Sequence, residues 1–257
     1  MKGVILAGGS GTRLYPLTRI TNKHLLPIYD RPMVTYAIEA LVNAGVRDVM
    51  IVSGGTHAGE FFRLLGNGHD HGLDRLFYAY QEQAGGIAEA LGLAERFVER
   101  DRVVVMLADN VVEYSIADAI VNFSHQERGA RILLSRVTDP AHLHHLGVPE
   151  FDDSRRVTQI VEKPHEPPSE YAVTGIYLYD ASVWDVIPVL QPSGRGELEI
   201  TDVNNWYVRE RSMQYQILDG FWGDAGESID AYYTVNDFVR QHGANKTRPR
   251  AARSAAH

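Results

Sequence analysis

The sequence of 257 residues contains no cysteine, and it has neither a long apolar run nor an excess of basic residues. The lack of cysteine excludes disulfide frameworks and thiolate metal sites. No stretch approaches the roughly 20 apolar residues that span a bilayer, and the N-terminal apolar run is too short for a signal peptide. The net charge of −8 argues against a nucleic-acid-binding protein, which usually carries a basic patch. We therefore expect a cytoplasmic protein with no membrane and no nucleic-acid partner.

The composition is that of an ordinary soluble globular protein, with 44% hydrophobic and 23% charged residues. The length suits one large α/β domain, or a main domain with an insertion. No internal repeat and no long linker divides the chain. The segment 243–257 is basic and contains no acidic residue. We predict one domain over 1–242 and a disordered tail over 243–257, with a functional basic arm as the alternative.

Apolar runs and helical periodicities alternate along the first half of the chain. Strands are expected at 4–7, 46–52, 76–80 and 103–108, and helices at 31–45, 60–65 and 87–97. This alternation predicts a parallel, doubly wound sheet with ligands outside the carboxyl ends of its strands. The glycine-rich segment 8–11, the loop 81–86 and Asp109 all follow such ends.

The second half of the chain is less regular. We expect strands at 131–137, 147–151, 157–162, 171–179 and 215–218, and helices at 117–123, 181–190, 199–209 and 228–241.

Residues 8–11 read Gly-Gly-Ser-Gly and are followed by Arg13 and Lys23. Glycines let successive backbone N–H groups converge on an anion, and the two basic side chains add the charge that a polyphosphate requires. A Walker loop would have Lys and Ser/Thr where Thr12 and Arg13 stand, and Leu14 replaces the third glycine of the dinucleotide fingerprint. The segment therefore predicts a phosphate site of another kind, with a plain turn as the alternative.

The stretch 3–27 resembles the signature Leu-x-Gly-Gly-x-Gly-Thr-Arg-Leu-x-Pro-Leu-Thr…Lys-x-Leu-Leu-Pro of the sugar-1-phosphate nucleotidyltransferases. Within them it is most similar to the glucose-1-phosphate thymidylyltransferases, and the resemblance covers about residues 1–240. It implies a single Rossmann-like, three-layer α/β/α domain with a mainly parallel mixed sheet and a small β-rich sugar-binding part. The nucleotide half would span about 1–115 and the sugar half about 116–242.

The resemblance also implies a reaction. A nucleoside triphosphate is joined to a sugar 1-phosphate, pyrophosphate is released, and Mg²⁺ is the cofactor. Asp109 stands in Leu-Ala-Asp-Asn, close to the family pattern Leu-Gly-Asp-Asn. Asp224 stands in Trp-Gly-Asp-Ala-Gly, close to Trp-Leu-Asp-Thr-Gly. Both are the implied metal ligands, although an aspartate at a strand end more often caps a turn or a helix.

Further roles follow from matching motifs. Arg13 and Lys23 match the family residues that bind the triphosphate. Lys163 in Glu-Lys-Pro matches the family lysine that binds the sugar phosphate. Together with Asp109, these three are the expected catalytic residues. The implied nucleotide-binding residues are Leu6, Ala7, Gly8, Gly9, Ser10, Gly11, Thr12, Arg13, Gln81, Gly86 and Asp109. The implied sugar-phosphate-binding residues are Asn110, Gly147, Glu162, Lys163, Val173, Thr174 and Gly175. Glu197 and Glu199 have at most a supporting role, or lie in the first turn of a helix.

The expected substrates are dTTP and α-D-glucose 1-phosphate, with dTDP-glucose and pyrophosphate as products. Gln81 and Gly86 match positions that contact a pyrimidine, but one methyl group separates thymine from uracil by only about 1–3 kcal/mol. Leu146 stands where the family often has tyrosine, and Val-Val-Glu at 111–113 replaces Phe-Tyr-Gly, both near the sugar. UTP, or a different hexose 1-phosphate, is therefore an alternative. A catalytically silent sensor of nucleotide sugars is an alternative of another class.

Two expectations concern regulation and assembly. Larger bacterial thymidylyltransferases continue past this C-terminus with helices that build an allosteric nucleotide site, so we expect weak or absent feedback inhibition. Relatives assemble into dimers and tetramers, so a homo-oligomer is expected.

The histidines do not predict a metal site. They are grouped at 69–71 and 142–145 without the i, i+4 spacing of a zinc protease helix. We expect His69, His71, His142, His144 and His145 to lie in solvated loops.

Overall fold

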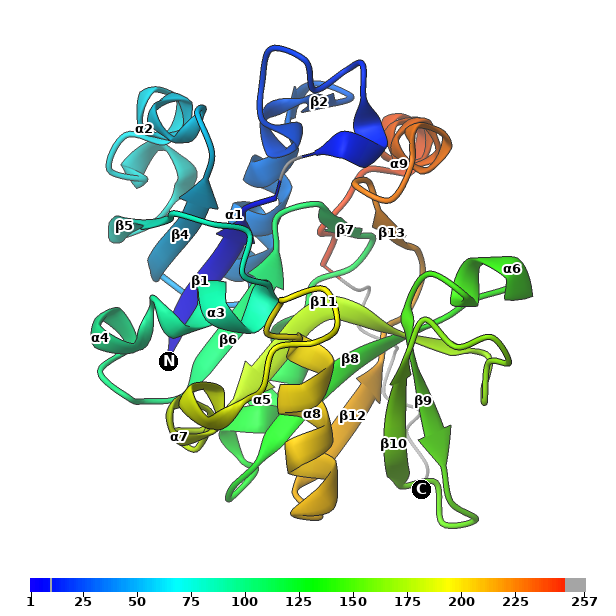
Figure 1. The fold of residues 1–257 in the computed structure, drawn as a ribbon. Helices are drawn as coiled ribbons and strands as arrows, with labels where there is room; N and C mark the ends of the chain where they lie inside the picture. Colours follow the sequence, from blue (N-terminus) through cyan, green and yellow to red (C-terminus); the bar gives the residue numbers. More distant parts are fainter. Residues whose placement is uncertain (10, 248–257) are drawn as a thin grey trace, which may run out of the picture.

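The computed structural model describes residues 1–9 and 11–247, so the predicted site residue Ser10 lies outside the described residues. A seven-stranded sheet with the order β12-β8-β11-β6-β1-β4-β5 crosses the molecule (Figure 1). Its strands are β1 (Lys2–Ala7), β4 (Asp48–Gly54), β5 (Arg75–Gln81), β6 (Val103–Leu107), β8 (Ala130–Arg136), β11 (Tyr171–Tyr179) and β12 (Met213–Ile217). β11 runs antiparallel to β6 and β8, and the other neighbours pair in parallel. The predicted mainly parallel mixed sheet is confirmed.

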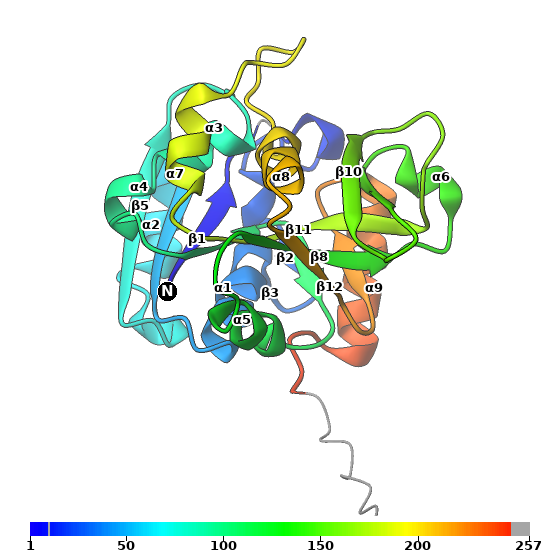
Figure 2. The same cartoon turned by 90° about the horizontal axis from the view of Figure 1, so that it is seen from below.

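Helices cover both faces of this sheet. Along β1, Ile5 and Ala7 belong to one buried cluster and Val4 and Leu6 to another, because successive side chains of a strand point to opposite faces. The first cluster packs against α1 (Met33–Asn43), α2 (Ala58–Leu65) and α5 (Ala117–Ser124). The second packs against α3 (Ile87–Gly92), α4 (Glu95–Val98), α7 (Val183–Val186) and α8 (Ile200–Arg209). Figure 2 shows α3, α7 and α8 on one side of the sheet and α1 and α5 on the other, which confirms the three layers.

Small ribbons and one long helix complete the fold. Three two-stranded ribbons pair β2 (Pro27–Ile28) with β3 (Arg31–Pro32), β7 (Asn110–Val112) with β13 (Trp222–Asp224), and β9 (Gly147–Phe151) with β10 (Val157–Glu162). The helix α9 (Ile229–His242) starts at Ser228, whose hydroxyl accepts a hydrogen bond from the Ala231 N–H at 3.0 Å. Short helical turns are α6 (Pro140–Leu143), η1 (Thr12–Leu14), η2 (Lys23–Leu25), η3 (His69–His71) and η4 (Ile187–Val189).

Several predicted helix bounds are wrong for identifiable reasons. Arg31 and Pro32 pair as β3, so α1 begins only at Met33. The helix expected over 87–97 breaks after Gly92. The helix expected over 181–190 changes into η4 around Pro188, which has no N–H to continue the α-helical pattern.

The predicted disordered tail begins too early. The Asn245 Nδ2 donates to the Tyr36 carbonyl and to Glu39 Oε2, each at 2.9 Å, and Asn245 is buried. Lys246 Nζ lies 2.7 Å from Glu113 Oε1. These partners hold the chain against α1 and β7, and the rest of the predicted tail lies outside the described residues. Within the described part, no helix is both long enough and apolar enough to cross a bilayer.

Candidate active site

A cavity of about 380 Å³ opens at the carboxyl ends of β1 and β6, and β10, β11 and α8 close its other side. It brings together groups that lie far apart in the sequence. The predicted site residues that line it are Leu6, Gly8, Gly9, Gly11, Thr12, Arg13, Lys23, Gln81, Gly86, Asp109, Asn110, Gly147, Glu162, Lys163, Val173, Gly175 and Asp224.

The side chains of two predicted site residues point away from this cavity. Ala7 is fully buried in the cluster beneath β1. Thr174 is fully buried as well, and its hydroxyl donates to the Leu133 carbonyl at 2.9 Å. Because strand neighbours alternate between faces, Leu6, Val173 and Gly175 face the cavity instead. The structure therefore does not support ligand contact by the Ala7 or Thr174 side chain.

Arg13 lines the cavity and has no ion-pair partner in the part of the chain that the structure describes. Gly11 has φ 64°, a left-handed conformation that favours glycine, and its carbonyl accepts a bond from the Thr18 hydroxyl at 2.8 Å. Arg13 follows in η1 with an exposed side chain. Among residues 1–9 and 11–247, no ion pair to Arg13 occurs. Its guanidinium is free to bind an anionic ligand.

Two carboxylates, buried Asp109 and half-buried Asp224, lie side by side at the centre of the cavity. Asp224 ends β13 opposite Asn110, and the Ala225 N–H donates to the Asp109 carbonyl at 2.9 Å. Lys23 Nζ lies 2.5 Å from Asp109 Oδ2. Burial raises the pKa of Asp109, but the charge of Lys23 and the contact with His24 outweigh it and hold this pKa well below its usual range. Burial and the charge of Asp109 raise the pKa of Asp224 to about 7.

Apart from burial, the opposite directions of the two shifts follow from the position of Lys23. Its ammonium is paired with Asp109, whereas Asp224 has the negative charge of Asp109 as its neighbour. A further cation between the two carboxylates would remove this repulsion. The electrostatics of the pair therefore fit a divalent metal site.

Gly226 keeps this centre open. A Cβ at this position would lie 2.4 Å from Asp109 Oδ2 and 2.7 Å from Lys23 Nζ. Any side chain would displace the ion pair, so the glycine two residues after Asp224 is required by close approach.

Asn110 fastens the two carboxylates to the sheet. Its Oδ1 accepts from the Gly175 N–H at 2.9 Å and from Trp222 Nε1 at 2.6 Å. Its Nδ2 donates to Asp109 Oδ1 at 3.1 Å. Through these contacts Asn110 holds β7, β11 and β13 together and positions Asp109. This positioning role adds to the predicted contact of Asn110 with the sugar phosphate.

The loop after β5, which contains the predicted base-binding residue Gly86, packs against the start of α8. Gln81 Nε2 donates to the Gly86 carbonyl at 3.2 Å. Gly86 has φ 100°, and a Cβ there would lie 2.4 Å from the Leu198 carbonyl oxygen. The Leu198 N–H donates to the Gly85 carbonyl at 2.8 Å. The loop is therefore held against the segment that carries Glu197 and Glu199.

On the opposite side, Lys163 sits in a strained turn at the end of β10. Its φ is 47°, and its N–H donates to the Leu146 carbonyl at 3.0 Å. Its Nζ lies 3.4 Å from Glu162 Oε1, while Glu162 Oε2 accepts from the Thr201 hydroxyl at 2.7 Å. The turn directs the lysine to the cavity beside a carboxylate that is already oriented.

The sequence analysis missed several cavity residues. They are His24, Ala84, Ile87, Ala90, Tyr177, Arg195, Thr201, Asn204, Trp222 and Gly226. Three of them, His24, Trp222 and Gly226, lie within the motifs that contain Lys23 and Asp224, and Arg195 stands two residues before Glu197.

Tyr177 shares its strand face with Gly175, so period-two alternation could have found it. Burial raises its pKa, which keeps the phenol protonated. Arg195 Nη2 lies 2.9 Å from Glu199 Oε1 and 3.4 Å from Glu197 Oε2, so both acids pair with this arginine.

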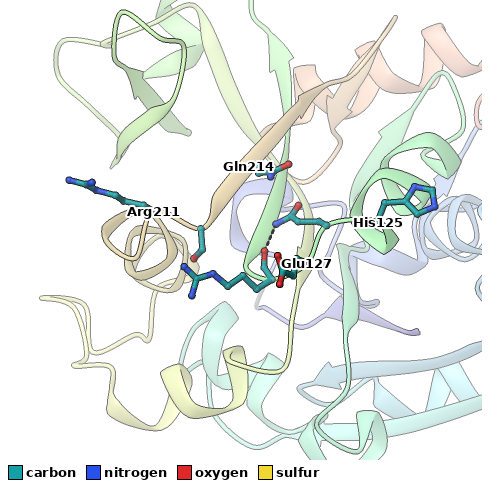
Figure 3. Close-up of a pocket in the computed structure, with 7 residues that line it drawn as sticks. His125, Glu127, Arg211 and Gln214 are labelled. Atoms are coloured by element: carbon teal, nitrogen blue, oxygen red, sulfur yellow. Dashed lines mark hydrogen bonds between the residues drawn. The ribbon is translucent and has the colours of Figure 1, made fainter.

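A separate cavity of about 340 Å³ contains none of the predicted residues (Figure 3). It lies between the segment after α5 and the turn from α8 into β12. In Figure 3 the side chains of Arg211 and His125 point in opposite directions, so their charges do not converge on one ligand. It is therefore a weaker candidate than the first cavity.

Comparison with known proteins identifies the family. The family model for nucleotidyl transferases matches residues 2–242. The chain is 42% identical to a glucose-1-phosphate thymidylyltransferase of Neisseria meningitidis over 243 residues, which are 93% of this chain and 83% of that protein. A Bacillus anthracis protein assigned as a glucose-1-phosphate thymidylyltransferase, solved with a sucrose, has a TM-score of 0.88 and 46% identity, covering 93% of this chain and 95% of the other.

A UDP-glucose pyrophosphorylase complexed with UDP-glucose has a TM-score of 0.80 at 22% identity, covering 93% of this chain and 98% of the other, and shares the fold. The resemblance predicted from the sequence motifs is confirmed: the chain belongs to the nucleotidyl transferase family.

Proposed function

We propose that this protein transfers a thymidylyl group from dTTP to α-D-glucose 1-phosphate in a Mg²⁺-dependent reaction that yields dTDP-glucose and pyrophosphate. One observation carries the proposal. A single cavity has the glycine-rich loop and Arg13 on one side, Lys163 and Arg195 on the other, and Asp109 with Asp224 between them. Two anionic substrates can be held there against each other.

The two carboxylates would hold the metal. Mg²⁺ usually takes one or two carboxylates together with substrate phosphate oxygens and waters. Asp109 and Asp224 match this number, and over residues 1–9 and 11–247 no group of three or more potential ligands forms. When bound, the ion would neutralise the charge that spreads over the phosphates.

The residues of the chain then have distinct tasks. Lys163 and Arg195 hold the sugar phosphate so that one of its oxygens attacks the α-phosphorus in line with the leaving pyrophosphate. Arg13 and the N–H groups of the glycine-rich loop stabilise the β- and γ-phosphates as the bond to the α-phosphorus breaks. Little covalent chemistry is required of the protein, since positioning and charge stabilisation supply most of the rate.

The choice of substrates rests on two kinds of support. The names of the Neisseria meningitidis and Bacillus anthracis relatives favour dTTP and glucose 1-phosphate. Gln81 and Gly86 line the cavity, and an amide side chain and a backbone group are suited to read a pyrimidine edge. Leu146 lines the cavity where the family often has tyrosine. This apolar side chain would change the contacts to the sugar, so transfer to a different hexose 1-phosphate is the second candidate function. The cytoplasmic location and the homo-oligomeric state stay predictions.

Pyrophosphate release, measured with dTTP, UTP and other triphosphates against a set of sugar 1-phosphates and Mg²⁺, tests the proposal. We expect the highest kcat/KM for dTTP with glucose 1-phosphate. A higher value for another pair would change the substrates. No release with any pair would overturn nucleotidyl transfer and favour a nucleotide-sugar sensor.

A further inference from the structure

The short helix α6 lies above the hairpin of β9 and β10, at the edge of the molecule (Figure 1). Asp139 caps it, because its Oδ1 accepts a hydrogen bond from the Ala141 N–H at 3.0 Å. The helix carries His142, and His144 and His145 follow it directly. His145 lines the large cavity. These are histidines that the sequence places in a solvated loop.

His142 joins α6 to the segment that follows Asp224. Its Nε2 is paired with Glu227 Oε2. Glu227 comes directly after Gly226, the residue that packs on Asp109 and Lys23. The His142 side chain is 33% exposed and that of Glu227 13%, so the pair is partly shielded from water. The expectation of a solvated loop is wrong for His142.

The other end of the same segment is fastened to the turn of Lys163. His144 Nδ1 is hydrogen-bonded to the Pro164 carbonyl at 2.9 Å. The Leu146 carbonyl accepts from the Lys163 N–H at 3.0 Å. The segment 142–146 is therefore attached at one end to the loop of Asp224 and at the other to the turn of Lys163.

We propose that His142 and Glu227 form a clasp that sets the position of Lys163 relative to Asp224 and so holds the sugar phosphate in place for transfer. His142 is thereby a positioning residue, which acts through Glu227 and the turn of Lys163. The inference rests on the proposed function, because it takes Lys163 as the ligand of the sugar phosphate and Asp224 as a metal carboxylate.

The clasp depends on the charge of His142. The hydrogen bond to Glu227 raises the pKa of His142 despite its burial, and the charges of Glu227, Asp224 and Asp139 act in the same direction. A pKa that is raised in the folded protein means that the pair contributes fully below the ordinary histidine value and is lost as the pH rises through the raised value. The clasp therefore opens on the alkaline side.

Steady-state kinetics of His142→Gln, Glu227→Gln and the double variant test the clasp. We expect each single change to raise KM for the sugar 1-phosphate about three- to tenfold while KM for dTTP changes less than about twofold. The double variant should be no worse than either single variant, because both remove the same contact. His69→Gln and Glu210→Gln, which change exposed residues elsewhere, should match the wild type.

The pH profile separates a clasp from a merely structural role. The ratio of the KM values of His142→Gln and wild type should be largest near about pH 6 and should fall toward one near about pH 9. Substrate ionisation cancels in this ratio. A ratio that does not change with pH, additive effects in the double variant, or an unchanged KM would each overturn the clasp.

A second measurement does not require turnover. In NMR titrations, the ring of His142 should titrate above the ordinary histidine value in the wild type and shift downward in Glu227→Gln. An ordinary value in the wild type would overturn the clasp. If instead the wild type releases no pyrophosphate while His142 titrates high, the clasp stands and the proposed function fails.

Discussion

The predicted nucleotide half, about residues 1–115, and the predicted sugar half, about 116–242, build their parts of the cavity in different ways. In the nucleotide half, β1, β5 and β6 run in parallel, and their carboxyl ends deliver the glycine-rich loop, Gln81 and Asp109 to one edge. In the sugar half, β11 is reversed, and the cavity residues come from β10, β11, α8 and β13. The first arrangement follows from chain order, and the second depends on long-range contacts such as those of Asn110.

Asp109→Asn should have the largest effect, because it removes the carboxylate on which both halves converge. We expect kcat to fall about a thousandfold, since an amide is a poorer ligand for Mg²⁺ and the charge at the reacting centre changes. The free energy of unfolding should fall by about 3 kcal/mol, because the Lys23 side chain, only 12% exposed, loses its ion-pair partner.

Kinetics combined with thermal unfolding check this prediction. Asp70→Asn, a change of an exposed residue, serves as the control. A folded Asp109→Asn protein with nearly normal kcat would contradict the metal assignment.

Gly226→Ala tests whether the sugar half must leave room for the ion pair of the nucleotide half. The added methyl group would meet Asp109 Oδ2 and Lys23 Nζ, and displacement of these groups should lower kcat about 10- to 100-fold. Gly59→Ala in α2, where no atom lies within 4 Å of the added Cβ, should leave kcat unchanged. Equal rates for the two variants would show that the close contact at Gly226 is not needed.

Lys163→Ala and Arg13→Ala compare the two halves directly. We expect Lys163→Ala to raise KM for the sugar phosphate about 10- to 100-fold with little change in KM for the triphosphate, because a charge-assisted contact to one substrate is lost. Arg13→Ala should instead lower kcat and raise KM for the triphosphate. Initial rates with each substrate varied give the two KM values. The comparison fails if both variants raise KM for both substrates to the same degree.

Gln81→Ala should have the smallest effect. Loss of hydrogen bonds to the base should raise KM for the triphosphate about fivefold and change kcat less. Gln83→Ala, two residues later and exposed, is the matched control. If kcat falls more than KM rises, Gln81 belongs near the reacting centre instead of the base.

Local patterns predict the nucleotide half well. Gly8 and Asp109 follow apolar runs directly, and such runs determine where parallel strands end. The break of the helix at Pro188 could also have been predicted, because proline cannot donate the required hydrogen bond.

The sugar half depends on contacts that no local pattern reveals. His142 meets Glu227 across 85 positions, and Trp222 meets Asn110 across 112. The short strands β7 and β13 form only because they pair with each other. The sequence motifs predict Asp224 and Lys163 in this half. The residues that hold these two side chains in place can be identified only from the folded structure.

The central claim is that the sugar half presents a phosphate oxygen to the α-phosphorus that the nucleotide half holds. Its most direct test is ³¹P NMR of the products formed from dTTP and glucose 1-phosphate labelled with ¹⁸O on its phosphate. The account predicts label in the oxygen that bridges the two phosphorus atoms of dTDP-glucose and none in pyrophosphate. Label in pyrophosphate, or a bridging oxygen without label, would contradict it.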